Sequence, residues 1–126
     1  YYDLMFNSKY EINEVMMIGG AGYGYPKHYI STYPTKSIDV VEIDGDITKL
    51  AKKYFYLDKL ISDYNLNENH RLELINEDGR TYLNRNTKKY DAILNDAFSG
   101  DIPAKTLTTL ELIQKIKNSL NENGLY

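Results

Sequence analysis

Glycines follow the first apolar run of this chain, and glycine is the residue that lets a backbone approach a ligand closely. Gly19, Gly20 and Gly22 come directly after the run 15–18. A glycine turn between a strand and a helix also presents free backbone N–H groups. A dinucleotide-binding turn has the pattern G-x-G-x-x-G, which would require a third glycine at the position that Tyr25 occupies. The spacing therefore predicts a small-molecule site but ranks a pyrophosphate ligand low.

An acidic residue stands at the end of the second apolar run. Glu42 lies between Val41 and Ile43, 20 residues beyond Gly22. An acidic residue at about that distance is placed to accept both hydroxyl groups of a ribose. The alternative is a solvated carboxylate that closes a strand. A carboxylate in a buried run needs a partner, so the pattern favours contact with a ligand.

Two later segments place further carboxylates after apolar runs. Asp78, followed by Gly79, could accept the exocyclic amine of adenine, or it could cap a short helix. Asp96 and Asp101 lie in the long loop 95–103, either as a base or cation-binding group with a mobile lid, or as part of a loop rich in turn-forming residues. Together with Glu42 these residues predict an acidic rim around a glycine floor. Such a rim suits an adenosine ligand with a cationic group, or an amine, and repels a pyrophosphate.

Strands and helices are predicted to alternate along the chain, which indicates a parallel sheet covered on both faces. Ligands of such sheets bind beyond the carboxyl ends of the strands. Pro26 suits a first helical position, and the segment 108–111 matches a capping box. The predicted strands are 15–18, 38–43, 71–75 and 92–95; the predicted helices are 26–32, 47–54, a less regular stretch 56–69, 81–85, and a last helix with Leu110, Ile113, Ile116 and Leu120 buried. Asn123-Gly124 would end that helix, and Leu125-Tyr126 would begin a fifth strand.

Composition excludes several classes of protein. The chain has 126 residues, a net charge of −3 and no cysteine, so we expect one domain over residues 1–126, no disulfide and no thiolate metal site. Scattered lysines and arginines argue against nucleic acid as a partner. No apolar stretch approaches the roughly 18 residues of a membrane span, and we expect a cytoplasmic protein.

His28 and His70 lack a second ligand at metal spacing, so no metal is predicted. Because the sequence starts with Tyr1 and stops after a turn, we expect the chain to be a piece of a longer protein. The tyrosines around the glycine turn are interpreted as core packing.

Six stretches of the chain resemble the spermidine synthase family, and more closely its spermidine-synthase-like branch. They are "MMIGGAGYGYPKHY", "IDVVEID", "LAKKYF", "NEDGRTYL", "KKYDAILNDAFSGDIP" and "LTTLELIQKIKNSLNENGLY". They occur in the family's order and cover most of the chain from Val15 onward. The resemblance implies a Rossmann-like doubly wound α/β fold related to the methyltransferases that use S-adenosylmethionine, here stopping at the start of strand five.

The resemblance also implies an activity. Members of the family transfer an aminopropyl group from decarboxylated S-adenosylmethionine to putrescine, and they form homodimers or larger assemblies. The family's ribose-binding acid falls on Glu42, its adenine-contacting Asp on Asp78, and its catalytic Asp on Asp96. The nucleoside site would then comprise Gly19, Gly20, Gly22, Glu42, Ile43, Asp78 and Gly79.

The chain departs from the family pattern at two places. Gly22 stands where spermidine synthases usually carry an Asp that holds the aminopropyl amine. The signature after strand four is normally Asp-Ser-small-Asp-Pro, whereas this chain has "DAFSGDIP", which displaces Asp101. Two alternatives to aminopropyl transfer therefore stay open: a methyltransferase that uses S-adenosylmethionine, and a non-catalytic nucleoside-binding domain.

Overall fold

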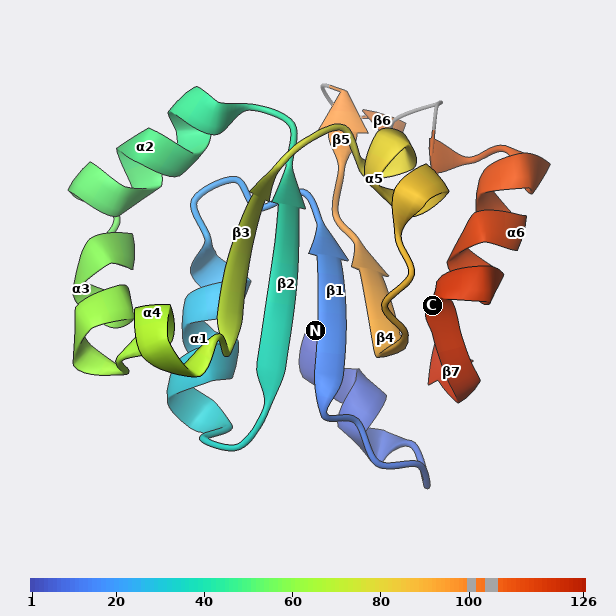
Figure 1. Cartoon of the computed structure of the whole chain (residues 1–126), viewed down its shortest axis with the longest axis horizontal. Coiled ribbons are helices and arrows are strands. Elements are labelled where there is room, and N and C mark those ends of the chain that lie inside the picture. The colour runs from blue at the N-terminus through green and yellow to red at the C-terminus, as the bar shows by residue number, and fades with distance from the viewer. Residues whose placement is uncertain (100–101, 104–106) are drawn as a thin grey trace.

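The computed structural model describes residues 1–99, 102–103 and 107–126, and it contains one parallel five-stranded sheet (Figure 1). The strand order is β3-β2-β1-β4-β7, with every neighbouring pair parallel. A second, two-stranded antiparallel sheet joins β5 and β6. The bounds of the strands are β1 Glu14–Ile18, β2 Ser37–Glu42, β3 Leu72–Asn76, β4 Tyr90–Asn95, β5 Phe98–Ser99, β6 Ile102–Pro103 and β7 Leu120–Leu125. The predicted doubly wound α/β fold is confirmed.

Helices cover both faces of the large sheet. Side chains of η1, α1, α3 and α4 join one buried cluster, and those of α5 and α6 join another. The bounds are η1 Tyr2–Asn7, α1 Gly24–Thr32, α2 Gly45–Tyr54, α3 Leu57–Asp63, α4 Leu66–Asn69, α5 Gly79–Arg85 and α6 Leu110–Ser119. The irregular stretch 56–69 is thus two short helices, and η1 is an additional element that the sequence pattern did not predict.

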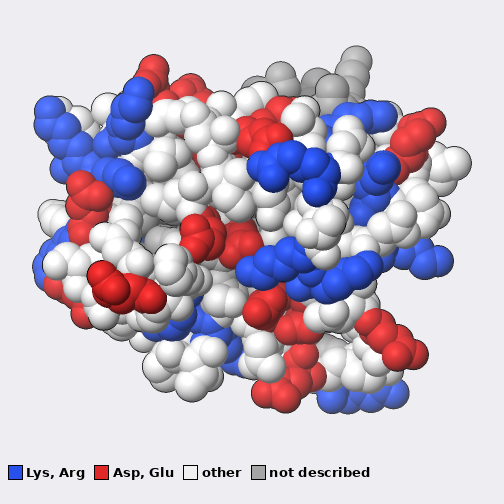
Figure 2. Space-filling model, viewed as in Figure 1, with Lys and Arg blue, Asp and Glu red and all other residues white. Residues whose placement is uncertain are grey.

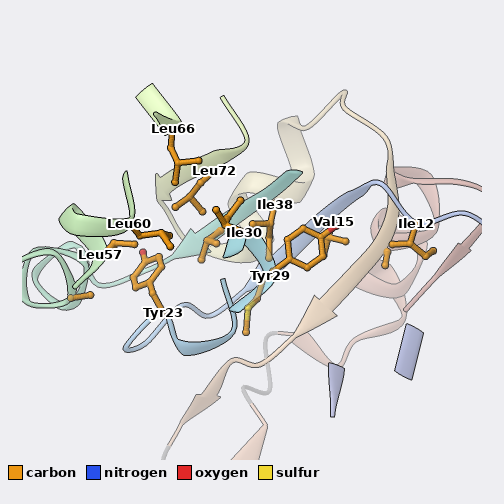
Figure 3. Close-up of a cluster of buried hydrophobic side chains, with 14 of the residues drawn as sticks. Ile12, Val15, Tyr23, Tyr29, Ile30, Ile38, Leu57, Leu60, Leu66 and Leu72 are labelled. Atoms are coloured by element: carbon orange, nitrogen blue, oxygen red, sulfur yellow. The ribbon is translucent and has the colours of Figure 1, made fainter. Parts of the chain in front are cut away.

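Alternation along the central strand explains how one sheet supports two clusters. Successive side chains of a strand point to opposite faces. Val15 and Met17 therefore enter the cluster beneath α1, while Met16 and Ile18 enter the cluster beneath α5 and α6. Figure 3 shows side chains of the strands and of α1, α3 and α4 meeting in the first cluster, with Tyr23 and Tyr29 among them. The interpretation of these two tyrosines as core residues is confirmed.

The predicted helix starts need correction. α1 begins at Gly24, two residues earlier than expected, because Tyr23 adopts a left-handed conformation and turns the chain into the helix. At α6 the cap is Thr109, whose hydroxyl accepts a hydrogen bond from the Leu112 amide. The predicted capping box 108–111 was therefore one residue too early.

The buried stripe of the last helix was predicted correctly at Ile116 and, in part, at Leu120, but wrongly at Leu110 and Ile113. Leu110 is 82% exposed and Ile113 is 44% exposed, whereas Leu112, Ile116 and Ser119 face the core. Apolar residues occupy more than one face of this helix, so spacing alone could not select the buried one.

The fifth strand begins five residues earlier than predicted. The helix ends at Ser119, and β7 pairs with β4 from Leu120 onward, with an irregular register between the two paired positions. The Asn123-Gly124 pair, which we interpreted as a helix end, lies within this strand. At the second strand, Ile43 lies just beyond β2 and is 69% exposed.

Within the described ranges, no helix is both long and apolar enough to cross a lipid bilayer.

A buried carboxylate on β2 accepts hydrogen bonds from side chains near the cluster beneath α5. Asp39 of β2 is only 4% exposed, and its Oδ2 accepts hydrogen bonds from the Tyr90 hydroxyl at 2.7 Å and from the Lys88 ammonium at 3.0 Å. The Tyr82 and Tyr90 hydroxyls lie 2.7 Å apart. Burial, followed by these hydrogen bonds, raises the pKa of Tyr90 far above its usual range. The tyrosine hydroxyl is therefore a permanent donor to the carboxylate.

We expect Tyr90→Phe to destabilise the fold because it leaves Asp39 with fewer donors. A hydrogen bond to a charged group contributes about 1.5–3 kcal/mol, and the free energy of unfolding in urea should fall by that amount. Tyr54→Phe, on an exposed side chain, is the control and should stay within about 0.5 kcal/mol of the parent. Equal stability of the two variants would contradict the role given to this network.

Candidate functional site

A cavity of about 670 Å³ opens beyond the carboxyl ends of the first four strands of the chain. Its volume falls in the range of small-molecule sites. The lining includes four carboxylates, Glu42, Asp44, Asp78 and Asp96, and no lysine or arginine of the described part of the chain. Figure 2 shows acidic atoms at the upper edge, between α2 and α5, and basic atoms at the upper left over α2. Glu42, Asp78 and Asp96 of the predicted acidic rim thus line one cavity, and their contact with a ligand stays a prediction.

Two glycines beside this cavity are packed so closely against the backbone or the core that a side chain would collide there. A Cβ atom on Gly19, whose φ is +91°, would lie 2.7 Å from the Asp96 carbonyl oxygen. A Cβ atom on Gly79 would lie 2.6 Å from the Ile18 side chain. Both positions therefore require glycine, and both line the cavity as predicted.

Glu42 fastens the glycine turn to the end of β2. The carboxylate is 6% exposed, and one oxygen accepts hydrogen bonds from the Gly20 amide at 2.7 Å and the Ala21 amide at 3.0 Å. Its other oxygen accepts the Asp44 amide at 2.9 Å. A carboxylate accepts about four hydrogen bonds, so one acceptor position remains. The partner that a buried carboxylate requires is thus the turn itself, and contact with a ligand stays a prediction.

The Tyr23 ring packs against the same turn. A Cβ atom on Gly20 would lie 2.8 Å from the Tyr23 ring, and the Tyr23 hydroxyl lies 2.7 Å from the Thr48 hydroxyl. Burial raises the pKa of Tyr23, so its hydroxyl stays protonated. The turn is therefore held on both sides before any ligand arrives.

Asp78 and Asp44 combine a helix cap with a place at the cavity. The Asp78 Oδ1 accepts the Thr81 amide at 2.9 Å at the start of α5, and the Asp44 Oδ1 accepts the Asp46 amide at 2.9 Å at the start of α2. The capping alternative for Asp78 is confirmed, and the residue also lines the cavity. Each cap uses one oxygen of its carboxylate.

Asp96 has a neighbour that the sequence pattern did not reveal. Tyr2 of η1 is close enough to the Asp96 carboxylate for the carboxylate to affect the pKa of the tyrosine. Burial raises the pKa of Tyr2 well above its ordinary value, and the carboxylate of Asp96 adds to this effect. Ninety-four residues separate the two side chains, so no local spacing could have indicated the pair.

The structure brings most of the predicted site residues together. Gly20 and Gly22 do not line the cavity: the amide of Gly20 binds Glu42, and a Cβ atom on Gly22 would meet only open space. Asp101 lies outside the described residues. No group of three metal-binding side chains occurs within the described ranges. The predicted residues that do line the cavity are Gly19, Glu42, Ile43, Asp78, Gly79 and Asp96, and lining residues that were not predicted include Ala21, Asp44, Ile47, Phe98 and Leu107.

Solved structures share this fold at low sequence identity. Human methyltransferase-like protein 13, in complex with SAH, superposes with a TM-score of 0.74 and 21% identity over 98% of this chain and 55% of that protein. Spermidine synthase from Thermotoga maritima superposes with a TM-score of 0.72 and 23% identity over 95% of this chain and 38% of that enzyme. At these identities the likeness shows the fold.

Sequence comparison identifies nearer relatives. The polyamine aminopropyltransferase of Vibrio vulnificus is 32% identical over 125 residues, which are 97% of this chain and 38% of the relative. The polyamine aminopropyltransferase of Methanocaldococcus jannaschii is 31% identical over 111 residues, 88% of this chain and 36% of the relative. The chain thus spans less than two fifths of the length of these relatives.

A sequence model of a protein family agrees with the resemblance of the six stretches. The sequence model of the spermine/spermidine synthase domain matches residues 3–126, which include the glycine turn, Glu42, Asp78 and Asp96. This match covers nearly the whole sequence, so the chain belongs to the spermine/spermidine synthase family.

Proposed function

We propose that the protein containing this chain is an aminopropyltransferase that takes decarboxylated S-adenosylmethionine and a polyamine such as putrescine. The observation that carries the proposal is the acidic cavity at the strand ends, with Glu42, Asp78 and Asp96 on its rim. The names of the sequence relatives support it. The charge of the cavity suits the co-substrate. Carboxylates attract a cationic nucleoside and repel a pyrophosphate, and the glycine backbone lets a ligand approach closely.

The reaction requires orientation and the removal of a proton. The amine nitrogen attacks the carbon beside the sulfonium, a C–N bond forms, the C–S bond breaks, and the sulfur leaves as a neutral thioether. Putrescine is protonated near neutral pH, so a base must accept a proton before or during attack. In this proposal Asp96 orients the ammonium and accepts its proton. Glu42 accepts ribose hydroxyls, and Asp78 contacts the adenine.

Gly22 is the observation that favours a second candidate function. An Asp at this position would carry a charge toward a free aminopropyl amine, whereas Gly22 leaves open space and no charge. S-adenosylmethionine itself, with a methyl group to transfer, is therefore the alternative co-substrate. Methyl transfer needs mainly alignment of the two reactants and places less demand on a base.

The ligand preference is tested first, by thermal shift on the full-length protein. Methylthioadenosine and both forms of S-adenosylmethionine should raise the melting temperature more than NAD does, because the rim repels a pyrophosphate. A ligand at 100 times its dissociation constant stabilises the fold by about 2.7 kcal/mol, so equal concentrations rank the affinities. A shift with NAD and none with the nucleosides would overturn the nucleoside assignment.

Glu42→Gln should weaken nucleoside binding. The amide nitrogen of glutamine cannot accept a hydrogen bond, so either the turn or the ribose loses an acceptor worth about 1.5–3 kcal/mol. Nucleoside affinity by calorimetry should fall about tenfold or more. Glu77→Gln is the matched control, because Glu77 neighbours Asp78 but pairs with Arg85 and does not line the cavity. If Glu42→Gln and Glu77→Gln bind the nucleoside with similar affinity, Glu42 only holds the glycine turn and does not contact the ribose.

Asp96→Asn should separate chemistry from binding. The variant keeps the shape and removes the base, so we expect turnover by the full-length enzyme to drop about 10²–10⁴-fold. Nucleoside affinity should stay within a few-fold of the parent, and Asp63→Asn on α3 serves as the control. A parent protein that transfers no aminopropyl group to any polyamine would exclude the proposed reaction. An Asn variant with full rate would exclude Asp96 as the base and make Asp101 the residue to test.

A further inference from the structure

The bend between β2 and α2 consists of three residues that all line the cavity, Glu42, Ile43 and Asp44. One contact holds the bend from within, because the Glu42 carboxylate accepts a hydrogen bond from the Asp44 amide. The backbone carbonyls of the bend need donors as well. Figure 1 shows that β3 runs beside β2 up to this bend, so the end of β3 is the element that can supply them.

Asn76, the last residue of β3, supplies these donors. It is paired with Glu42 across the sheet, and its Nδ2 donates to the Glu42 carbonyl and to the Ile43 carbonyl, at 3.0 Å in both cases. The Glu42 carbonyl also accepts the Glu77 amide at 3.1 Å. A side-chain amide nitrogen carries two hydrogens, so it serves both carbonyls at once. Asn76 is exposed and does not line the cavity, so it holds the bend without occupying the space of a ligand.

Gly45, the first residue of α2, leaves room for this amide. A Cβ atom on Gly45 would lie 2.5 Å from the Asn76 Oδ1 and 3.0 Å from its Cγ. The φ of Gly45 is not in the left-handed region, so its backbone conformation alone does not require glycine. The Asn76 side chain is thus the neighbour that restricts position 45. The amide is enclosed between the bend and the start of the helix, which fixes its orientation.

We infer that Asn76 is a positioning residue, which holds the bend 42–44 in the shape that receives the nucleoside. Without this side chain the Ile43 carbonyl loses its donor, and the peptide between Ile43 and Asp44 is less restrained. That peptide contains the Asp44 amide, so its rotation would disturb the Glu42 carboxylate together with the Ile43 side chain at the cavity. The consequence for nucleoside binding rests on the proposed function, whereas the contacts of Asn76 do not.

Binding of methylthioadenosine to the full-length protein tests this consequence with a neutral probe. Asn76→Ala should weaken binding about 3- to 10-fold, as expected for lost hydrogen bonds. Asn76→Asp keeps the shape but turns oxygens toward the carbonyls, and it should weaken binding at least as much. KM for the nucleoside should rise while kcat stays within about twofold, because Asn76 touches no reacting atom. The matched control is Asn69→Ala, which breaks a 2.8 Å bond from another exposed amide to the Tyr64 carbonyl, just before β3. Parent affinity in both Asn76 variants would overturn the inference.

Gly45→Ala reaches the same contact by a second route. The added methyl group displaces the Asn76 side chain and leaves that residue in the chain, so affinity should fall to about the level of Asn76→Ala. In the Asn76→Ala background the methyl group meets no amide, so Gly45→Ala should change affinity there by less than about twofold. Equal losses from Gly45→Ala in the two backgrounds would contradict the inference, because position 45 would then act without Asn76.

Hydrogen exchange of the full-length protein tests the contacts without any ligand. A peptide that covers residues 40–47 contains the Asp44 amide, which donates to the Glu42 carboxylate. Asn76→Ala and Gly45→Ala should each speed the exchange of this amide about tenfold because the bend opens more often, whereas Asn69→Ala should leave it unchanged. Unchanged exchange in both of the first two variants would refute the positioning role. A parent protein that binds no nucleoside would refute the proposed function, while the exchange rates would still decide the role of Asn76.

Discussion

The carboxylate of Glu42 is the contact on which the site depends. It joins the end of β2 to the glycine turn after β1 and to the start of α2, through the amides of Gly20, Ala21 and Asp44. A buried carboxylate that accepts several amide hydrogen bonds fixes the backbone that donates them. The cavity next to this contact is therefore shaped by the protein alone, and a ligand need not order the turn on binding.

The same contact limits what Glu42 can do for a ligand. Three of its acceptor positions are used by backbone amides, so binding two ribose hydroxyls requires sharing an oxygen or releasing an amide. A diol that displaced the Ala21 amide would loosen one side of the turn, although Tyr23 still supports the other. Any ribose interaction of Glu42 would consequently be coupled to the stability of the turn.

Sequence pattern predicted the layers of the fold better than the details of the site. Periodicity identified the first four strands, the third by its alternation over 71–75 and the others as short, mostly apolar runs. Glycine or acidic residues follow closely after each of them, at the end where parallel sheets bind ligands. Periodicity failed at α6, where apolar residues lie on more than one face, and at β7, where Asn and Glu residues conceal a strand. It also could not predict that the partner of Glu42 is the backbone, because amide donors have no sequence signature. Nor could it predict that Tyr2 lies near Asp96, because the two residues are far apart in the sequence and Tyr2 belongs to a 3-10 helix that has no periodic pattern.

Asp96 connects the two halves of the site through different atoms. Its carbonyl oxygen lies so close to Gly19 that no side chain fits there, while its carboxylate is near enough to Tyr2 of η1 to raise the pKa of that tyrosine. The glycine turn and η1 thus meet at one residue, and α1 begins where the turn ends and anchors η1 through Tyr25. In the proposed reaction the nucleoside would lie on the turn and the amine at Asp96, so the close backbone approach of Gly19 to Asp96 would set the relative position of the two reactants. This arrangement favours alignment of the two reactants, which an in-line displacement demands above all.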